Sequence, residues 1–370
     1  MLAAWQARAA PGFAAGQEVM QMSDAEYWRH GGTPTPATNV AAYARRFEDL
    51  GWDGLMVGQD IGVGPDSYLF LAYAAAATSR LKVGTGVSIP VRHAMDVANT
   101  IVTLWALTGR RSYVSFGRGD GGFAQIGRPP MKVGEFTDYM TQVDRYLRHL
   151  DVDLDGFASN LSAIFGHDSS LDLDKPPVDI SATGPRMIDY AARTADGVSF
   201  AVGANVSRLR ECVELARQAH ASTSRAPGSL TLSAYVPIAV HGVEGVDRDT
   251  AREIVRGVVL RHSRFSAFEG KLLGNVASTD QQAILRSFEV TRDYGRRMPK
   301  KPDFAAGSGL PDDYVDRFAV VGDPRECADR LSEIAGLGIN RLVLLTRVPT
   351  TDPDEDNATR VGRYVLPLVK

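Results

Sequence analysis

Two short segments of the chain carry residue types, at a spacing, that could bind and transform a small ligand. The first is SFGRGDGGF, residues 115–123, in which Arg118 and Asp120 stand among four glycines. Glycines let the backbone approach a flat ligand, and the planar guanidinium of Arg118 can donate charge-assisted hydrogen bonds to a phosphate or a carboxylate. Asp120 could face the same ligand. The alternatives are a solvated surface turn and, because the segment contains Arg-Gly-Asp, a cell-adhesion loop.

The second segment is SATGPRMI, residues 181–188, which is typical of a strand, a turn and the start of a helix. Pro185 and Arg186 are the first helical residues, and free backbone N–H groups at such a helix start bind phosphate. The alternative is an ordinary strand-to-helix turn that has proline at its first helical position.

The elements that must position these segments follow from a recurring pattern, a short apolar strand and then an amphipathic helix. The pattern predicts seven strands, at residues 54–57, 81–89, 112–116, 178–182, 197–202, 230–240 and 339–346. An eighth strand has to precede the helical segment 38–51, and only the weak LAAWQARA, residues 2–9, is available. Strands that alternate with helices imply a parallel sheet, and eight such units predict an α/β fold of the (β/α)8 TIM-barrel type in one domain, residues 1–370.

Such a barrel needs about 250 residues, so insertions are expected after strands 1, 4 and 7, at residues 10–36, 151–177 and 266–317. One helix start is marked by Asp323 as N-cap, Pro324 and a capping-box Glu326. The active site of a barrel of this kind lies at the carboxyl ends of its strands. The candidates are therefore the residues directly after the apolar runs: Gln59 and Asp60, 86–88, 117–120, 183–186 and Gly203.

The amino-acid composition indicates which classes of binding partner are not expected. The 370 residues include 41 Lys and Arg against 44 Asp and Glu, a net charge of −3 that would not attract nucleic acid or anionic lipid. No apolar run approaches the roughly 20 residues that span a bilayer, and no leader pattern opens the chain, so we expect a cytoplasmic protein. The two cysteines, Cys212 and Cys327, exclude a disulfide framework and are expected as buried helix residues. The histidines lack ligand spacing, so no metal site is expected.

Five ordered blocks of the chain carry a resemblance to a known family. They are EDLGWDGLMVG (48–58), AAATSRLKVGTGVSIPVRH (75–93), FGRGDGGFAQIGRPP (116–130), ISATGPRMIDYAARTADGVSFAVG (180–203) and VVGDPRECADRLSEIAGLGINRLVL (320–344). With them, residues 37–347 resemble the luciferase-like flavin and deazaflavin oxidoreductase superfamily, in particular its branch of methylenetetrahydromethanopterin reductases. The resemblance implies a (β/α)8 barrel that binds FMN or the deazaflavin coenzyme F-420 at the strand ends, usually as a homodimer.

The resemblance also assigns residues. Gly86 and Val87 match a non-prolyl cis peptide that faces the cofactor ring. Gly119 and Asp120 match a Gly followed by an acidic active-site residue in deazaflavin-using relatives. Arg118 matches an arginine that lies near the cofactor phosphate in flavin-using relatives. The segment that holds the phosphate end corresponds to Thr183, Gly184, Pro185 and Arg186.

Two departures from the family affect the prediction. After strand 2 the family usually has Asp or Glu followed by His or Ser, whereas this chain has Gln59 and Asp60, so the proton donor is either Asp120 or Asp60. Strand 1 lacks the usual Val- or Ile-rich start. His93, after strand 3, could line the pocket or could cap the following helix.

Three functions are consistent with these observations. The first is hydride transfer between bound F-420 and a small organic substrate, with Asp120 or Asp60 as acid or base. The second is an FMN-dependent monooxygenase that receives reduced flavin from a partner reductase. The third is a non-catalytic interaction protein, favoured by Gln59 in place of an acid and opposed by the intact GTGV and ATGPR segments.

Overall fold

Eight parallel strands form a closed barrel in the computed structural model, which describes residues 25–31, 37–59, 61, 64–161, 175–267, 310–346 and 357–370. In order around the barrel they are β1 (Glu26–His30), β2 (Gly54–Val57), β3 (Lys82–Ser88), β4 (Ser112–Phe116), β7 (Val178–Ala182), β8 (Gly197–Phe200), β9 (Thr231–Val240) and β11 (Arg341–Leu345). The barrel closes because β11 pairs with β1, as Glu26 opposite Arg341 shows. The predicted (β/α)8 fold is confirmed.

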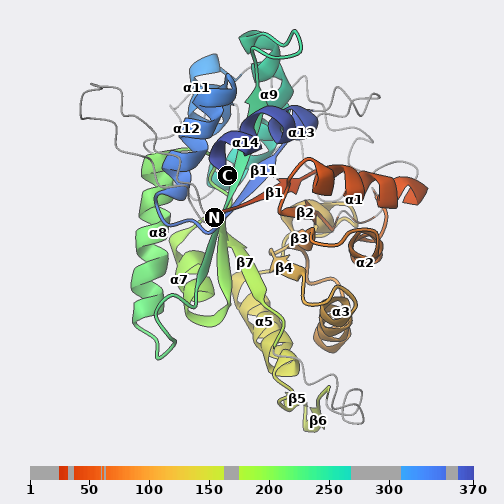
Figure 1. The fold of residues 1–370 in the computed structure, drawn as a ribbon. Coiled ribbons are helices and arrows are strands. Elements are labelled where there is room, and N and C mark those ends of the chain that lie inside the picture. The colour runs from red at the N-terminus through yellow and green to blue at the C-terminus, as the bar shows by residue number, and fades with distance from the viewer. Residues whose placement is uncertain are drawn as a thin grey trace, which may run out of the picture.

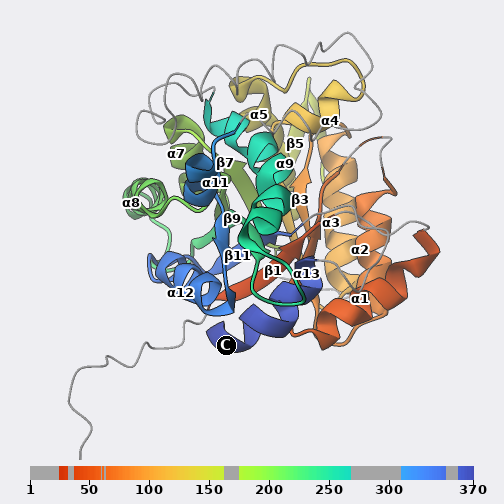
Figure 2. The same ribbon diagram turned by 90° about the horizontal axis from the view of Figure 1, so that it is seen from above.

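Helices surround the barrel on its outside (Figures 1 and 2). They are α1 (Val40–Asp49), α2 (Ser67–Ala76), α3 (Ala94–Leu107), α4 (Asp120–Ala124), α5 (Val133–Leu147), α7 (Pro185–Thr194), α8 (Val206–Ala221), α9 (Arg248–Ala267), α11 (Asp312–Phe318), α12 (Pro324–Ala335), and a C-terminal helix made of α13 (Asn357–Arg360), a π-helical turn (Val361–Val365) and α14 (Leu366–Val369). Side chains alternate along each strand, so Tyr27 of β1 packs in the layer between barrel and helices, while Trp28 packs inside the barrel with Met56 and Tyr113.

The position predicted for the first strand is wrong. Residues 2–9 lie outside the described part of the chain, and β1 is Glu26–His30, EYWRH, within the segment expected as the first insertion. The charged residues of EYWRH do not match the apolar pattern of a buried strand. In the structure these residues have partners elsewhere in the chain. The Arg29 guanidinium carbon lies 4.4 Å from the centre of the Phe47 ring, and Glu26 pairs with Arg341 at 3.2 Å.

The other two insertions contain small elements of their own. After α5, β5 (Val152–Leu154) and β6 (Phe157–Ser159) form an antiparallel hairpin. The long segment after α9 includes α11, and its residues 268–309 lie outside the described part. A short strand that was not predicted, β10 (Val320–Gly322), extends the sheet beside the far end of β9.

Side-chain hydrogen bonds stabilise two helix ends, the start of α12 and the end of α1. The predicted capping box of α12 is confirmed: the Asp323 carboxylate accepts from the N–H groups of Arg325 and Glu326, and Glu326 accepts from the N–H of Asp323. At the end of α1, Glu48 accepts three backbone N–H bonds, from Ser79, Arg80 and Leu81, at 3.0, 2.7 and 2.9 Å. Glu48 thereby ties α1 to the segment that enters β3.

Candidate active site

The glycine-rich segment follows β4 at the mouth of the barrel, the face at which the strands' carboxyl ends lie. The N–H of Gly117 donates to the Ser88 carbonyl at 2.9 Å, which links the ends of β4 and β3. Gly119 has a φ of 91°, a left-handed conformation that favours glycine, and is the N-cap of α4. Asp120 is therefore the first residue of α4, a short helix at the upper edge of Figure 2. Its side chain lies outside the described part.

Arg118 is half-buried and contacts the segment that leads into α5. Its Nη1 donates to the Met131 carbonyl at 3.3 Å, and the Met131 N–H donates back to the Arg118 carbonyl at 2.9 Å. The first contact uses one of the five N–H donors of the guanidinium. The group is thus held at the strand end with donors remaining for an anion.

The end of β3 has the backbone conformation that the resemblance implied, because the Gly86–Val87 peptide is cis. The Val87 carbonyl accepts from the N–H of Gln59 at 3.0 Å, and the Gln59 side chain accepts from the N–H of Ile89 at 2.9 Å. Gln59 therefore joins the ends of β2 and β3, a role that an amide oxygen fills without acid chemistry. Asp60, the other predicted proton donor, lies outside the described residues.

The predicted phosphate segment lies where β7 passes into α7. Gly184 is an extended, buried N-cap, and Pro185 and Arg186 are exposed first residues of α7. The Thr183 carbonyl accepts a hydrogen bond from the Arg208 side chain at 3.3 Å, which links the turn between β7 and α7 to α8. A helix start of this kind presents backbone N–H groups and the positive end of the helix dipole to an anion.

These segments come together because β3, β4 and β7 are successive strands of the barrel. The candidate residues of the three strand ends therefore share one side of the mouth. His93 does not belong to this group: it is exposed, and its Nδ1 accepts from the N–H of Met95 at 3.2 Å as the N-cap of α3. The capping alternative is confirmed.

A buried polar cluster that was not predicted lies inside the barrel. The Asp179 carboxylate accepts from the hydroxyls of Ser115, Ser199 and Tyr113, at 2.6, 2.8 and 2.9 Å. Burial raises the pKa of Asp179, and the three hydroxyl donors oppose that rise. The Arg341 guanidinium carbon lies 3.7 Å from the centre of the Tyr113 ring. An acidic residue inside an apolar strand, Asp179 in VDISA of β7, was the available signal for this cluster.

Two further side chains were missed, His30 at the end of β1 and Tyr235, which is buried inside the barrel on β9. The ring of His30 is hydrogen-bonded to the Gly86 carbonyl. Its edge faces Tyr235, with 5.9 Å between the ring centres. Burial raises the pKa of Tyr235, and the Asp179 carboxylate raises it further, so the phenol keeps its proton. His30 could not be found while strand 1 was placed at residues 2–9.

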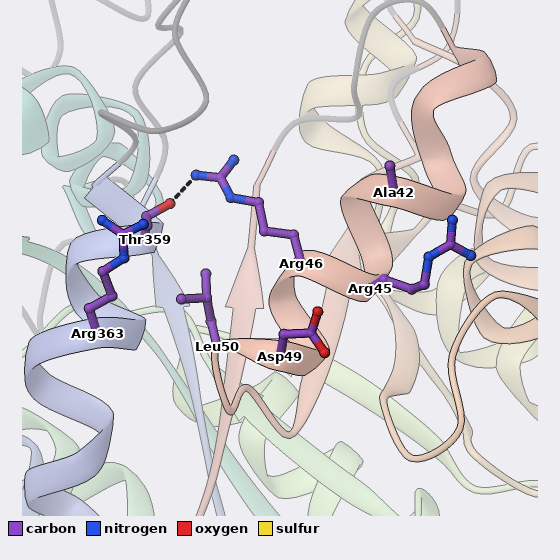
Figure 3. A pocket seen from close by; sticks show the side chains of 7 residues that line it. All are labelled: Ala42, Arg45, Arg46, Asp49, Leu50, Thr359 and Arg363. Carbon is purple, nitrogen blue, oxygen red and sulfur yellow. Dashed lines mark hydrogen bonds between the residues drawn. The ribbon is translucent and has the colours of Figure 1, made fainter.

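Other features of the described part do not extend the site. A groove of about 500 Å³ lies between α1 and the C-terminal helix, where Arg46 is hydrogen-bonded to Thr359 while the side chain of Arg45 points away (Figure 3). Cys212 and Cys327 are buried in α8 and α12, as expected. Among the described residues no three His, Cys, Asp or Glu side chains are grouped to hold a metal ion. None of the described helices is long and apolar enough to cross a membrane.

Comparison with known proteins agrees with the barrel fold. The model of the family of luciferase-like monooxygenases matches residues 19–341. A 5,10-methylenetetrahydromethanopterin reductase of Methanolobus tindarius is 23% identical over 342 residues, covering 90% of this chain and 96% of its own.

Two solved structures share the fold. The coenzyme F-420 dependent tetrahydromethanopterin reductase of Methanopyrus kandleri superposes with a TM-score of 0.68 at 21% identity, covering 94% of this chain and 99% of its own. A monooxygenase of Streptomyces bottropensis gives a TM-score of 0.65 at 18% identity, covering 92% and 99%.

The fold and the family match thus define a (β/α)8-barrel protein of a luciferase-like oxidoreductase family. The chain belongs to the luciferase-like monooxygenase family, and its similarity to methylenetetrahydromethanopterin reductases matches the branch indicated by the sequence blocks.

Proposed function

We propose that this protein is an oxidoreductase that transfers a hydride between bound coenzyme F-420 and a small organic substrate. The observation that carries the proposal is the arrangement of three successive strands, β3, β4 and β7, whose ends present Gly86–Val87, Arg118–Asp120 and Thr183–Arg186 on one side of the mouth. The relatives that are methylenetetrahydromethanopterin reductases support the same reaction class.

The donor groups at these strand ends fit a flat cofactor that carries a phosphate. Arg118 offers a guanidinium at the end of β4, and the start of α7 offers backbone N–H groups next to the exposed Arg186. These groups would hold the phosphate end. The Gly86–Val87 backbone would support the ring, and the left-handed Gly119 lets the chain turn beside it.

When bound, the deazaflavin ring supplies or accepts the hydride. The chain's own part is to orient the cofactor through Arg118 and to supply or remove a proton through Asp120 or Asp60. A carboxylic acid in a dry site can act as a general acid at neutral pH if its pKa is raised. Asp120 is the first choice because it begins α4 directly after Arg118 and Gly119.

The alternative function is an FMN-dependent monooxygenase supplied with reduced flavin by a partner reductase. The similarity to the Streptomyces monooxygenase and the family description support it. The same phosphate-binding groups would hold FMN. The reaction therefore depends on whether the bound ring is a deazaflavin or a flavin. Deazaflavin has carbon where flavin has its reactive ring nitrogen, so it carries hydrides without activating oxygen.

The test is to titrate the purified protein with F-420 and with FMN, and then to measure turnover with and without oxygen. We expect F-420 to bind more tightly and turnover to be independent of oxygen. Tight binding of FMN with oxygen consumption would establish the alternative. Binding of neither cofactor would leave the non-catalytic reading.

We also propose that the protein is a homodimer. Helix α2 is apolar on all sides, and its residues Leu69 and Tyr73, one turn apart, are 74% and 55% exposed. Apolar side chains on successive turns of one helix face mark a surface that another protein covers. A second copy of this chain is the occupant we propose, because the resemblance to the luciferase-like oxidoreductases implies a homodimer.

A further inference from the structure

His30 is placed to hold the backbone on which the proposed cofactor ring would rest. It is the last residue of β1 and is half-buried at the mouth, and its Nε2 is hydrogen-bonded to the Gly86 carbonyl. A carbonyl oxygen can only accept, so Nε2 carries the proton and donates it. This hydrogen bond joins β1 to β3, although β2 lies between them. Met56 of β2 is paired with His30 on one side and with Gly84 on the other.

The inner face of Gly86 is enclosed by side chains from three strands. A Cβ atom added to Gly86 would lie 2.8 Å from Cδ2 of His30, 3.0 Å from the phenol oxygen of Tyr235 and 3.1 Å from Sδ of Met56. Tyr235 comes from β9, which stands four strands from β3 in either direction around the barrel. Gly86 is thus supported from the adjacent and from the opposite wall, and its lack of a side chain is what allows the contact.

The side chains that surround His30 restrict its motion. Tyr235 is buried and meets the imidazole ring edge to face. Phenol and imidazole are large, rigid groups with few rotatable bonds, so the donor is held in place before any ligand arrives. The hydrogen bond therefore keeps the Gly86 carbonyl directed toward His30.

We propose that His30 is a positioning residue for the cofactor, which acts by holding the Gly86 carbonyl and with it the surface that Gly86 and Val87 present to the ring. This inference rests on the proposed function, because it takes F-420 or FMN as the ligand of the mouth. It differs from the assignment of Asp120 and Asp60, since His30 moves no proton in it.

The experiment compares two substitutions at one position. His30→Phe keeps an aromatic ring against Tyr235 and removes the N–H donor, whereas His30→Gln keeps an amide N–H that can reach the carbonyl. Each purified variant is titrated with F-420 and with FMN by absorbance and fluorescence, and its melting temperature is measured without cofactor. His93→Phe is the matched control, because His93 is an exposed histidine that caps α3.

We expect His30→Phe to raise the dissociation constant of the cofactor by about two- to tenfold, the change that corresponds to one hydrogen bond between neutral groups. His30→Gln should restore most of the affinity, and His93→Phe should leave it unchanged. The absorbance band of the bound ring should shift in His30→Phe and return in His30→Gln, which a general loss of stability would not produce.

The outcomes separate this inference from the proposed function. If the unaltered protein binds neither cofactor, the proposed function fails. If it binds one, and His30→Phe binds it equally well, His30 is not a positioning residue. Equal weakening in His30→Phe and His30→Gln, with both folded, also overturns the inference. Should His30→Phe not fold, His30→Met takes its place as the variant without a donor.

Discussion

Replacing Arg118 with alanine should weaken cofactor binding with little effect on folding. The side-chain contact that would be lost is the bond from Nη1 to the Met131 carbonyl, whose 3.3 Å is longer than the usual value of about 2.9 Å. The shorter bond between Met131 and Arg118 joins backbone atoms and remains in the variant. For a half-exposed side chain we therefore expect the free energy of unfolding to change by about 0.5 kcal/mol or less.

The loss in binding should be larger. A hydrogen bond from a charged donor contributes about 1.5–3 kcal/mol, which corresponds to about a tenfold to hundredfold rise in the dissociation constant. The assay is a fluorescence titration of Arg118→Ala with F-420 and with FMN, together with thermal unfolding and the turnover rate at saturating cofactor. Arg128→Ala is the control, because Arg128 is an exposed arginine between α4 and α5. Unchanged affinity for both cofactors in Arg118→Ala would refute the assignment and make Arg118 a substrate or surface residue.

The remaining predictions concern the proton donor, stability and assembly. Asp120→Asn should lower turnover by about 10² to 10⁴ with little change in melting temperature; a collapse only in Asp60→Asn would move the acid to β2. Burial alone would raise the pKa of Glu48, but backbone N–H donors hold it below the usual value. Its stabilisation is therefore complete above the unfolded pKa of about 4.3 and is lost as pH falls through the folded pKa. Glu48→Gln should cost about 1–3 kcal/mol at neutral pH in urea unfolding, and a difference that persists undiminished in acid would contradict this. Leu69→Lys on α2 should halve the mass measured by light scattering, whereas Leu368→Lys on the C-terminal helix should not.

The barrel could be predicted from the sequence because seven of its strands are apolar runs followed by amphipathic helices. A strand buried on both faces needs such a run, and the helix period then identifies the crossover. The first strand could not be found in this way. EYWRH buries Arg29 against the rings of Tyr43 and Phe47 and pairs Glu26 with Arg341. Those partners lie up to 315 residues away in the chain, beyond any local pattern.

The residues of the candidate site also differ in whether local sequence alone could identify them. Its glycine and proline positions were readable because backbone conformation restricts residue type locally, as the left-handed Gly119 and the helix start at Pro185 show. The roles of side chains that contact a different strand could not be predicted from local sequence. Gln59 was noted as a departure, but its bond to the N–H of Ile89 depends on how β2 and β3 are paired. His30 was missed together with its strand.

The choice between F-420 and FMN must then be made by the groups that face the ring. Arg118 and the start of α7 would address the phosphate end, a feature that the two cofactors share, so substitutions there should weaken binding of both by similar factors. The two cofactors differ in the ring. The Gly86 backbone, which we propose supports the ring, is contacted by His30 and Tyr235. Substitutions at His30 should therefore change the ratio of the two affinities. Because that ratio decides between hydride transfer and oxygen chemistry, the end of β1 would contribute to the reaction type as much as the glycine-rich segment after β4.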